Sequence, residues 1–291
     1  MDLRPRELLR EARRRGLLPK KALGQHFLVE EGIAERIVEL SQVDQRDVIL
    51  EIGPGIGALT FVLLERSRKV VAVEIDPRFI PFLREMAGDD DRLELLEGDI
   101  MEVDLGGIAL REGRLKVVSN LPYNLSVPIL FRLLEEREHL KGMTLMVQRE
   151  VAERITSPPG RKSYGALSVL CQLWADPKVV MYVPPGAFWP PPEVEGAVVR
   201  FELFEGSRVP VKDLSFFRRV VQACFLHRRK TLLNSLSSAG FGPKERLKEA
   251  LEGCGIDPRR RGETLSLEEL GKLEEALSCT VQEEVSHGLS L

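Results

Sequence analysis

Short apolar runs alternate with amphipathic stretches from residue 47 to about residue 150. The apolar runs are rich in β-branched residues and have the length of buried strands, and the stretches between them repeat apolar residues at helical spacing. The predicted strands are Val48–Ile52, Lys69–Ile75, Leu93–Glu97, Lys116–Ser119 and Met143–Val147. The predicted helices are Ala58–Arg66, Pro77–Met86, Ser126–Glu136 and Arg149–Thr156. This alternation predicts an α/β fold with a doubly wound, Rossmann-like parallel sheet.

The pattern changes at about residue 205. Before it, residues 157–165 have the composition of a loop, and the runs Lys178–Val183 and Ala197–Leu203 indicate strands on either side of a proline-rich segment. After it, the periodicity is helical only. The predicted helices there are Leu214–Phe225, Lys230–Ser238, Pro243–Glu252 and Leu267–Leu277. We therefore predict a sheet domain over residues 47–205 and a second, small all-helical domain over residues 206–278.

Residues 1–46 are predicted to form a basic N-terminal helical extension. The first 21 residues carry eight basic and three acidic side chains and no uninterrupted apolar run. The missing apolar run argues against a secretory signal, and the acids among the arginines argue against a mitochondrial presequence. An amphipathic helix attached to the folded body is the better interpretation. The tail, residues 279–291, lacks periodicity and is expected to fray.

Composition and cysteine spacing narrow the class of protein. The chain is 43% hydrophobic and 30% charged, which is typical of a globular protein and excludes a disordered chain or a disulfide-stapled miniprotein. No run approaches the ~18 consecutive apolar residues of a membrane-spanning helix. The cysteines at positions 171, 224, 254 and 279 are too far apart in sequence for a zinc knuckle or a redox dithiol. We expect no metal site, free thiols, a cytoplasmic protein and, without an extra apolar stripe, a monomer.

Charge is concentrated in a few segments. The net charge of −3 gives by itself no reason to expect a nucleic-acid partner. However, residues 218–230 hold five basic side chains and no acid, in addition to the basic first 21 residues, and Arg259–Arg261 add a third cluster. Such segments on an otherwise acidic chain can form a local phosphate-binding face. Solvated helix faces are the alternative for each of them.

A glycine-rich loop, Glu51–Gly57, follows the first predicted strand. In a doubly wound sheet this is where the backbone contacts a nucleotide-like ligand, and Gly53 and Gly55 permit the tight turn and the close approach. Glu74 ends the second strand, where its carboxylate can accept hydrogen bonds from both ribose hydroxyls. These residues predict an adenosine-bearing cofactor in preference to a structural glycine turn. The loop alone does not separate a nicotinamide dinucleotide from S-adenosylmethionine.

Polar residues also follow the third and fourth strands. Asp99 can accept a hydrogen bond from the adenine amine, with a turn or helix N-cap as the alternative. Asn120-Leu121-Pro122-Tyr123 follows the fourth strand at the same edge of the sheet. The Asn120 side-chain oxygen and a main-chain carbonyl can accept both hydrogens of a purine amine, which favours a pyramidal, nucleophilic nitrogen. Pro122 restrains the loop, and Tyr123 offers a face for a flipped base to stack on.

In this order, these motifs resemble those of the ribosomal RNA adenine N6-dimethyltransferases, specifically the family that acts on the small-subunit (16S) RNA. The resemblance runs from about Lys20 to Leu277. Its motifs are Lys21–Leu28, Glu51–Thr60, Val73–Asp76, Gly98–Asp99, Asn120–Tyr123, Gln148–Ala152, Val183–Pro192 and Phe225–Leu232. It implies N6,N6-dimethylation of two adjacent adenosines near the 3′ end of 16S rRNA, within the small ribosomal subunit or its precursor. It also implies S-adenosylmethionine as the methyl donor.

The resemblance further implies a role for individual residues. The cofactor-binding residues that it implies are His26, Leu28, Gly53, Gly55, Glu74, Asp99 and Asn120, of which the first two lie in a segment that covers the cofactor. The catalytic residues are Asn120, Pro122 and Tyr123. The substrate-binding residues are Leu121, Tyr123, Phe188, Arg228, Arg229 and Lys230. His26 stands where several members of the family have Asn. Taken alone, His26 would be an ordinary loop histidine and Phe188 core packing.

Three other interpretations stay open at this point. A related enzyme that methylates the large-subunit (23S) RNA shares the catalytic motifs. A nicotinamide oxidoreductase fits the glycine loop but leaves Asn120–Tyr123 unexplained. A ribosome-assembly factor that binds and leaves, with methylation secondary, is the third. Mapping the methylated product tests the first of these, and cofactor titration tests the second. Binding of subunit precursors by a catalytically dead variant tests the third.

Overall fold

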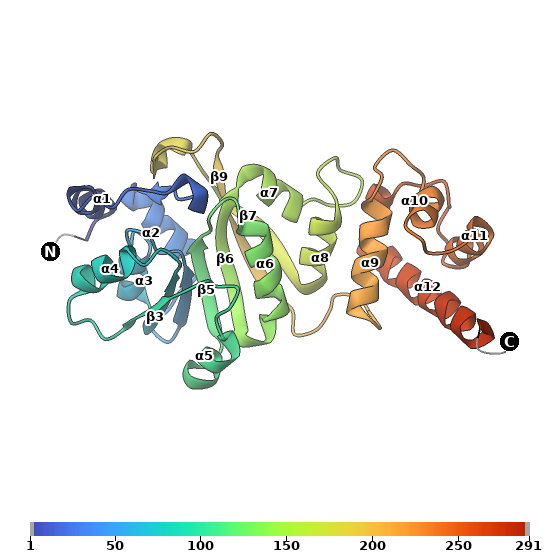
Figure 1. The fold of residues 1–291 in the computed structure, drawn as a ribbon, viewed down its shortest axis with the longest axis horizontal. Coiled ribbons are helices and arrows are strands. Elements are labelled where there is room, and N and C mark those ends of the chain that lie inside the picture. Colours follow the sequence, from blue (N-terminus) through green and yellow to red (C-terminus); the bar gives the residue numbers. More distant parts are fainter. Residues whose placement is uncertain (1–2, 289–291) are drawn as a thin grey trace. The chain divides into compact units, whose positions relative to one another are not determined.

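The computed structural model describes residues 3–288, with side chains described through Ser278. The chain divides into two compact units, one formed by Met1–Ala152 and Pro177–Leu203, the other by Glu153–Asp176 and Phe204–Leu291. Figure 1 shows the elements of both units.

The first unit is an α/β domain. Its strands are β1 (Phe27–Leu28), β2 (Val48–Ile52), β3 (Lys69–Glu74), β4 (Leu93–Glu97), β5 (Leu115–Asn120), β6 (Leu140–Gln148), β7 (Ala175–Val183), β8 (Phe188–Trp189) and β9 (Gly196–Leu203). Its helices are α1 (Pro5–Arg14), α2 (Glu31–Leu40), α3 (Thr60–Arg66), α4 (Phe79–Ala87), α5 (Leu105–Glu112), α6 (Ser126–Glu135) and the start of α7 (Arg149–Ile155). The first two residues of β7 belong to the second unit.

Seven strands form the main sheet, in the order β4-β3-β2-β5-β6-β9-β7. Strands β4, β3, β2, β5 and β6 are parallel to their neighbours in this series, and β9 runs antiparallel to β6. Every residue of β2 is buried, as expected for a parallel strand covered by helices on both faces. The predicted α/β fold with a Rossmann-like sheet is confirmed. The strand order reverses between β2 and β5, and ligands bind at such a point, beyond the carboxyl ends of the strands.

The second unit is helical, as the periodicity after residue 213 predicts. Its helices are α8 (Ala166–Trp174), α9 (Leu214–Phe225), α10 (Leu232–Ser238), α11 (Lys244–Gly253) and α12 (Leu267–Gly288), preceded by the end of α7. α12 continues past the predicted end at Leu277, through most of the tail that we expected to fray, and residues 289–291 lie outside the described residues. Asp213 begins α9 by accepting hydrogen bonds from the amides of Ser215 and Phe216.

Two helices within residues 47–205 are absent from the sequence prediction. α5 is short and contains Gly106 and Gly107, which are poor helix formers, and it begins because Asp104 accepts a hydrogen bond from the Gly107 amide. α8 is apolar nearly all round, so it has no polar face from which a helical period could be recognised. Burial on all sides therefore removed the signal that sequence analysis relies on.

The division into units also differs from the predicted boundary at residue 205. The segment 153–176 belongs to the helical unit, where the Tyr164 hydroxyl donates to the Leu265 carbonyl over 3.0 Å. The chain thus enters the helical unit after Ala152, returns for β7 and β9, and leaves again after Leu203. The predicted boundary corresponds to the second crossing alone, because the first crossing depends on contacts with residues about 100 positions further on.

Other expectations concern membranes, metals and thiols. No helix among the described residues is long and apolar enough to cross a membrane. The described residues hold no group of three or more His, Cys, Asp or Glu side chains that could bind a metal ion. Cys171, Cys224 and Cys254 are free thiols, and the side chain of Cys279 lies outside those described.

Candidate active site

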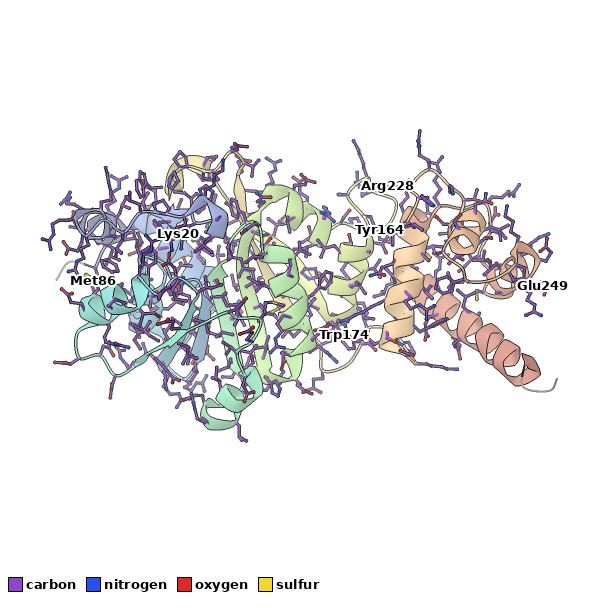
Figure 2. All side chains as sticks on the ribbon, in the orientation of Figure 1. Lys20, Met86, Tyr164, Trp174, Arg228 and Glu249 are labelled. Atoms are coloured by element: carbon purple, nitrogen blue, oxygen red, sulfur yellow. The ribbon has the colours of Figure 1, made fainter. Side chains whose placement is uncertain are left out.

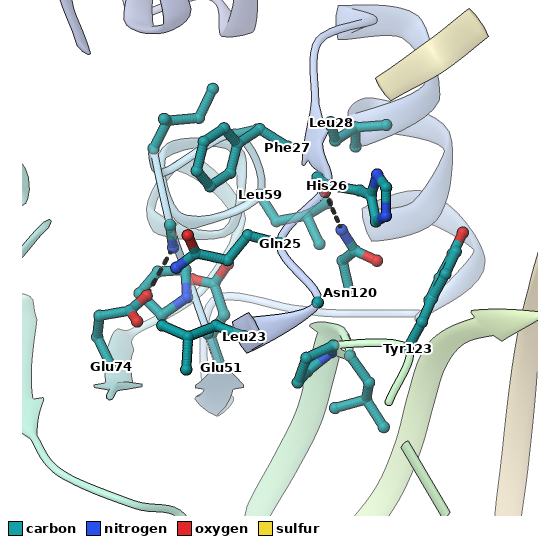
Figure 3. Close-up of a pocket in the computed structure, with 18 of the residues that line it drawn as sticks. Leu23, Gln25, His26, Phe27, Leu28, Glu51, Leu59, Glu74, Asn120 and Tyr123 are labelled. Atoms are coloured by element: carbon teal, nitrogen blue, oxygen red, sulfur yellow. Dashed lines mark hydrogen bonds between the residues drawn. The ribbon is translucent and has the colours of Figure 1, made fainter. Parts of the chain in front are cut away.

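A pocket lies at the carboxyl ends of β2, β3 and β5, where the strand order reverses (Figure 3). The segment before β1 and the residues of β1 line its other side. Most of the residues that the sequence analysis singled out meet here. The predicted residues among its lining are His26, Leu28, Gly53, Gly55, Glu74, Asn120, Leu121, Pro122 and Tyr123.

The glycine loop turns tightly at the end of β2. Gly53 and Gly55 have φ angles of 67° and 56°, a conformation that disfavours residues with a side chain. A Cβ on Gly55 would lie 3.0 Å from the ring of Phe27, so the backbone approach at this position also requires glycine. The Gly55 amide donates to the Glu74 carboxylate over 2.9 Å, which holds the loop against the end of β3.

Glu74 ends β3, as predicted, and the structure shows that it is buried there. One carboxylate oxygen accepts from the Gly55 amide and the other from the Asp76 amide, at 2.9 and 2.8 Å. Burial is the main influence on this carboxyl and raises its pKa. Because each oxygen has a second lone pair, both can still accept hydrogen bonds from a ligand that carries two hydroxyls.

Glu51 is a site residue to which the sequence analysis gave no role. It is 2% exposed, and burial raises the pKa of its carboxyl to about 8, helped by the nearby charge of Glu74. Its Oε2 atom is buried without a hydrogen-bond partner. A carboxyl in this state can gain a partner and its charge from a cationic ligand group. The sequence did carry a signal for this residue, because Glu51 is an acid within the otherwise apolar run 48–52.

Asn120 ends β5 and faces the pocket. Its side-chain amide donates to the His26 carbonyl over 3.2 Å, and Figure 3 shows it between His26 and Tyr123. This bond fixes which end of the amide is the oxygen. The oxygen, Oδ1, is buried and has no partner. Since unpaired buried acceptors are costly, this atom is prepared to accept a hydrogen bond from a bound molecule.

Tyr123 follows on the same loop. Its ring centroid lies 5.5 Å from that of His26 and 6.5 Å from that of Phe188, which meets it edge-on. Its hydroxyl is buried without a partner, and burial raises its pKa to about 12, so it stays protonated near neutral pH. Phe188 is 3% exposed, supports Tyr123 and does not line the pocket itself. The structure thus brings the two predicted base-stacking residues together.

Gly196 at the start of β9 makes room for this arrangement. A Cβ there would lie 3.2 Å from the Tyr123 hydroxyl oxygen, and within 3.6 Å of Phe188 and Val183. The sequence alone does not single out this glycine, because nothing in the local pattern links it to a loop more than 70 residues earlier.

The segment around β1 is fastened over the pocket. β1 pairs antiparallel with β8, with Leu28 opposite Phe188, and the His26 Nδ1–H donates to the Pro190 carbonyl over 2.7 Å. This pairing joins Leu28, which lines the pocket, to the strand that carries Phe188. Leu28 therefore lies in the pocket wall. The hydrogen bond from Nδ1 holds the His26 ring in one orientation, so Nε2 is the ring nitrogen left for other contacts.

A cluster of charges holds the start of this segment against the end of β3. Asp76 is ion-paired with Arg78 over 2.6 Å and with Lys20 over 3.4 Å, and Arg78 donates to the Leu18 carbonyl over 3.0 Å. The hydrogen bond from Arg78 lowers the pKa of Asp76 to about 2. The amide of Lys20 in turn donates to Gln25 over 2.8 Å.

Asp99 is not among the residues that line the pocket. Its carboxylate accepts from the Met101 amide over 2.9 Å, which is the turn geometry given above as the alternative to ligand binding. One carboxylate oxygen is occupied in this way, and an adenine-binding role for Asp99 stays a prediction.

The predicted basic triplet lies in the second unit, after α9. All three side chains are exposed, but they differ in their contacts. Arg228 donates to the Lys162 carbonyl and is paired with Glu263 over 3.6 Å. Lys230 donates to the Ser238 hydroxyl over 3.3 Å, and Arg229 has no partner among the described residues.

Comparisons with known proteins bear on this site. A family model described as ribosomal RNA adenine dimethylase matches residues 17–277. A ribosomal RNA small subunit methyltransferase A of Geobacter metallireducens is 48% identical over 265 residues, which cover 90% of this chain and 96% of the relative.

Two solved structures are also similar. A dimethyladenosine transferase from Plasmodium falciparum has a TM-score of 0.74 at 25% identity and covers 90% of this chain and 98% of its own. A 23S rRNA methyltransferase, ErmE, has a TM-score of 0.66 at 25% identity and covers 87% of this chain and 99% of its own.

Proposed function

Since the chain belongs to the ribosomal RNA adenine dimethylase family, we propose that it dimethylates N6 of two adjacent adenosines near the 3′ end of 16S rRNA in the small ribosomal subunit. The protein is an rRNA adenine dimethyltransferase. The observation that carries the proposal is the buried, unpaired Oδ1 of Asn120, which lies in the wall of a pocket with the features of an adenosine-cofactor site.

We propose S-adenosylmethionine as the cofactor. The residues fit its parts, since Glu74 has acceptors for ribose hydroxyls, the Gly53–Gly55 backbone allows close approach, and Glu51 suits a ligand ammonium group. Bound there, the cofactor supplies an electrophilic methyl group on a sulfonium. His26, Leu28 and Asp99 are proposed as further contacts to it, on the family resemblance.

Asn120 would orient the target amine. Its Oδ1 accepts one N6 hydrogen, and a main-chain carbonyl of the same loop accepts the other, so both acceptors gain strength as positive charge develops on the nitrogen. The hydrogen bond to the His26 carbonyl keeps Oδ1 pointed into the pocket during this step. Positioning and these acceptors supply the acceleration, with no strongly basic side chain needed.

Tyr123 would hold the target base, which must leave its RNA stack to reach the pocket. Phe188 meets the Tyr123 ring edge-on and fixes its angle. Pro122 limits the freedom of the loop that carries Asn120 and Tyr123, and Leu121 is buried beneath it. The protonated Tyr123 hydroxyl can donate to the substrate, which would give it the partner it lacks in the free protein.

The small-subunit RNA is preferred over the large-subunit RNA as the substrate. The relative named a small subunit methyltransferase is 48% identical over nearly its full length, whereas the 23S rRNA methyltransferase is 25% identical. Arg229 and Lys230 are proposed as RNA contacts in the second unit. We further propose that the protein acts as a monomer in the cytoplasm. A role in subunit assembly alone is disfavoured, because the unpaired acceptor of Asn120 serves chemistry and not docking.

Transfer of labelled methyl groups tests the proposal. Purified protein and labelled S-adenosylmethionine are incubated with unmethylated small ribosomal subunits, naked 16S RNA or naked 23S RNA, followed by nucleoside analysis. We expect N6,N6-dimethyladenosine in the small-subunit substrate. Label in 23S RNA would instead assign the protein to large-subunit methylation, and cofactor binding without label anywhere would favour the assembly role.

A further inference from the structure

The first unit has a second hollow, between the start of the chain, α2 and α3. Its volume is about 840 Å³, and it shares no lining residue with the active-site pocket. No step of the proposed reaction uses it. We call it the acidic groove, and the residues that define it are Glu31, Glu35, Glu39 and Glu65 at its rim and Val38 and Phe61 in its floor.

The floor of the acidic groove is apolar. Val38 and Phe61 are 3% and 5% exposed. The half-buried side chains of Val43 and Val62 line the groove beside them. Val38 and Phe61 belong to the same apolar cluster as Met86, which Figure 2 labels on α4. The core of the first unit therefore reaches the surface here, and it favours a ligand that brings apolar groups of its own.

The rim on α2 is acidic along one face of the helix. Glu31, Glu35 and Glu39 repeat at four-residue spacing, and all three are exposed. Side chains at this spacing are neighbours on the helix surface, where like charges repel and destabilise the helix. Glu39 is paired with Arg36 over 2.5 Å, but the side chains of Glu31 and Glu35 have no partner among the described residues. A cationic ligand would relieve their repulsion.

The whole lining carries an excess of negative charge. Glu65 on α3 adds a fourth carboxylate, and Arg4 and Arg66 are the two cations of the lining. Such an excess repels an RNA backbone. No group of three or more acids, histidines or cysteines among the described residues could hold a metal ion, so these carboxylates do not converge on one cation. The groove instead suits a ligand that carries several separate positive charges.

We propose that the acidic groove binds a polypeptide segment rich in Lys and Arg, with apolar side chains between them, from a protein of the small ribosomal subunit. The inference rests on the proposed function, which supplies the subunit as the binding partner. Proteins that neutralise rRNA phosphates do so with Lys and Arg, so their segments have the required charge. The apolar side chains of the segment cover Val38 and Phe61, and its cations pair with Glu31 and Glu35. This contact lets the enzyme distinguish the assembled subunit from naked RNA.

Binding of the double variant Glu31→Gln/Glu35→Gln tests the proposal. If the protein contacted RNA alone, removing two negative charges would strengthen binding or leave it unchanged, because the RNA is repelled less. With a basic segment in the groove, affinity for small ribosomal subunits should instead fall about tenfold at ~0.1 M salt, as expected for the loss of two exposed ion pairs. Affinity for naked 16S RNA, titrated in parallel, should not fall. Cofactor affinity should stay unchanged, because neither residue lines the active-site pocket.

The matched control is Asp89→Asn/Asp91→Asn. It removes two exposed carboxylates from the loop after α4, in the same unit but outside the groove. Their side chains also have no hydrogen-bond or ion-pair partner among the described residues. The change in net charge equals that of the test variant. The control should bind small subunits at least as tightly as the wild type.

Photo-cross-linking identifies what lies in the groove. The photoreactive residue p-benzoylphenylalanine in place of Arg66 lines the groove and leaves all four carboxylates intact. Irradiation with small ribosomal subunits should link it to a subunit protein, and mass spectrometry should locate the link in a segment rich in Lys and Arg. Adding Glu31→Gln/Glu35→Gln should reduce the link. The same photoreactive residue in place of Leu110, which is 90% exposed on α5, measures links from random collisions.

Several results would overturn the inference. A link to rRNA, to a second copy of the chain or to the chain's own residues would do so, as would no link above the Leu110 background. Unchanged affinity of the test variant for small subunits, or an equal loss in the control, would also do so. If the wild type methylates small subunits in any of these cases, the proposed function stands. If the wild type transfers no methyl group to small subunits, the proposed function itself fails.

Discussion

The pocket of the first unit and the basic loops of the second, residues 157–165, 226–231 and 257–264, differ in whether their unpaired polar groups are buried or exposed. In the pocket, oxygen atoms of Glu51, Asn120 and Tyr123 are buried without partners. On these loops, Arg161 and Arg229 have no partner among the described residues but are exposed to solvent. A buried unpaired atom costs free energy that a correctly shaped ligand recovers, whereas an exposed charge costs little and is screened by salt. The first region is suited to recognising particular atoms, and the second to recognising charge density.

The two regions are also built differently. The pocket residues stand at the ends of neighbouring strands, so the sheet sets their spacing. The basic residues stand on loops, and their spacing depends on a few hydrogen bonds and on the Arg228 side chain. We therefore expect substitutions in the pocket to affect turnover sharply and substitutions on these loops to affect binding gradually.

Asn120→Ala should have the largest effect. It removes the unpaired acceptor, and we expect kcat for methyl transfer to fall about 10³-fold while cofactor affinity falls much less. Asn120→Asp should also fail, because the carboxylate has no hydrogen to donate to the His26 carbonyl. Single-turnover transfer and cofactor titration measure the two quantities. Normal turnover by Asn120→Ala would remove Asn120 from the mechanism.

Salt should separate the two regions in the unaltered protein. Between about 50 and 200 mM KCl, binding to small subunits should weaken about 150-fold if four phosphate contacts are made. The affinity for S-adenosylmethionine should change less than about twofold, because the pocket is desolvated and screened little. Both are measured by titration at each salt concentration. If the affinities for small subunits and for S-adenosylmethionine depended equally on salt, the difference drawn between the two regions would be wrong.

The pH dependence of stability should report on Glu51. Its pKa of about 8 in the folded protein is raised above the value of 4.5 that it has when solvated. The unfolded chain therefore loses this proton at lower pH than the folded one, and the free energy of unfolding falls by about 1.4 kcal/mol per pH unit between about pH 5 and 8.

Glu51→Gln should remove this part of the pH dependence. Denaturant unfolding of the wild type and the variant at pH 5 and pH 8, without cofactor, gives the difference. At pH 5 the two should have similar stability, and at pH 8 the variant should be the more stable. Parallel profiles would mean that Glu51 is ionised in the folded protein.

Gly196→Ala should have the smallest effect. The added methyl group presses on the Tyr123 hydroxyl, at 3.2 Å, and should shift the ring by a few tenths of an ångström. We expect kcat/KM for the RNA substrate to fall about fivefold, with cofactor affinity unchanged. Gly142→Ala on β6 is the control, since its added Cβ would make an ordinary contact of 3.4 Å with the Phe201 carbonyl. Equal activity of both variants would show that the Tyr123 position tolerates displacement.

Local sequence patterns predicted the central part of the fold well. The strands of the parallel sheet are confirmed because they are short, buried and β-branched, and the glycine loop because its turn needs positive φ angles at Gly53 and Gly55. Helices α5 and α8 went unpredicted, since one is short and rich in glycine and the other has no polar face. The residues of the site were found where they followed a strand.

The sequence by itself determined the α/β class, the order of the motifs and the chemistry available at the ends of the strands, because each depends on contacts between near neighbours in the chain. The tertiary structure decided the rest. Only folding shows that Gly196 makes room for Tyr123, that Arg228 is engaged with Lys162 and Glu263, and that residues 153–176 belong to the helical unit. These are pairings between distant segments, and no local pattern records which distant residue a side chain will meet.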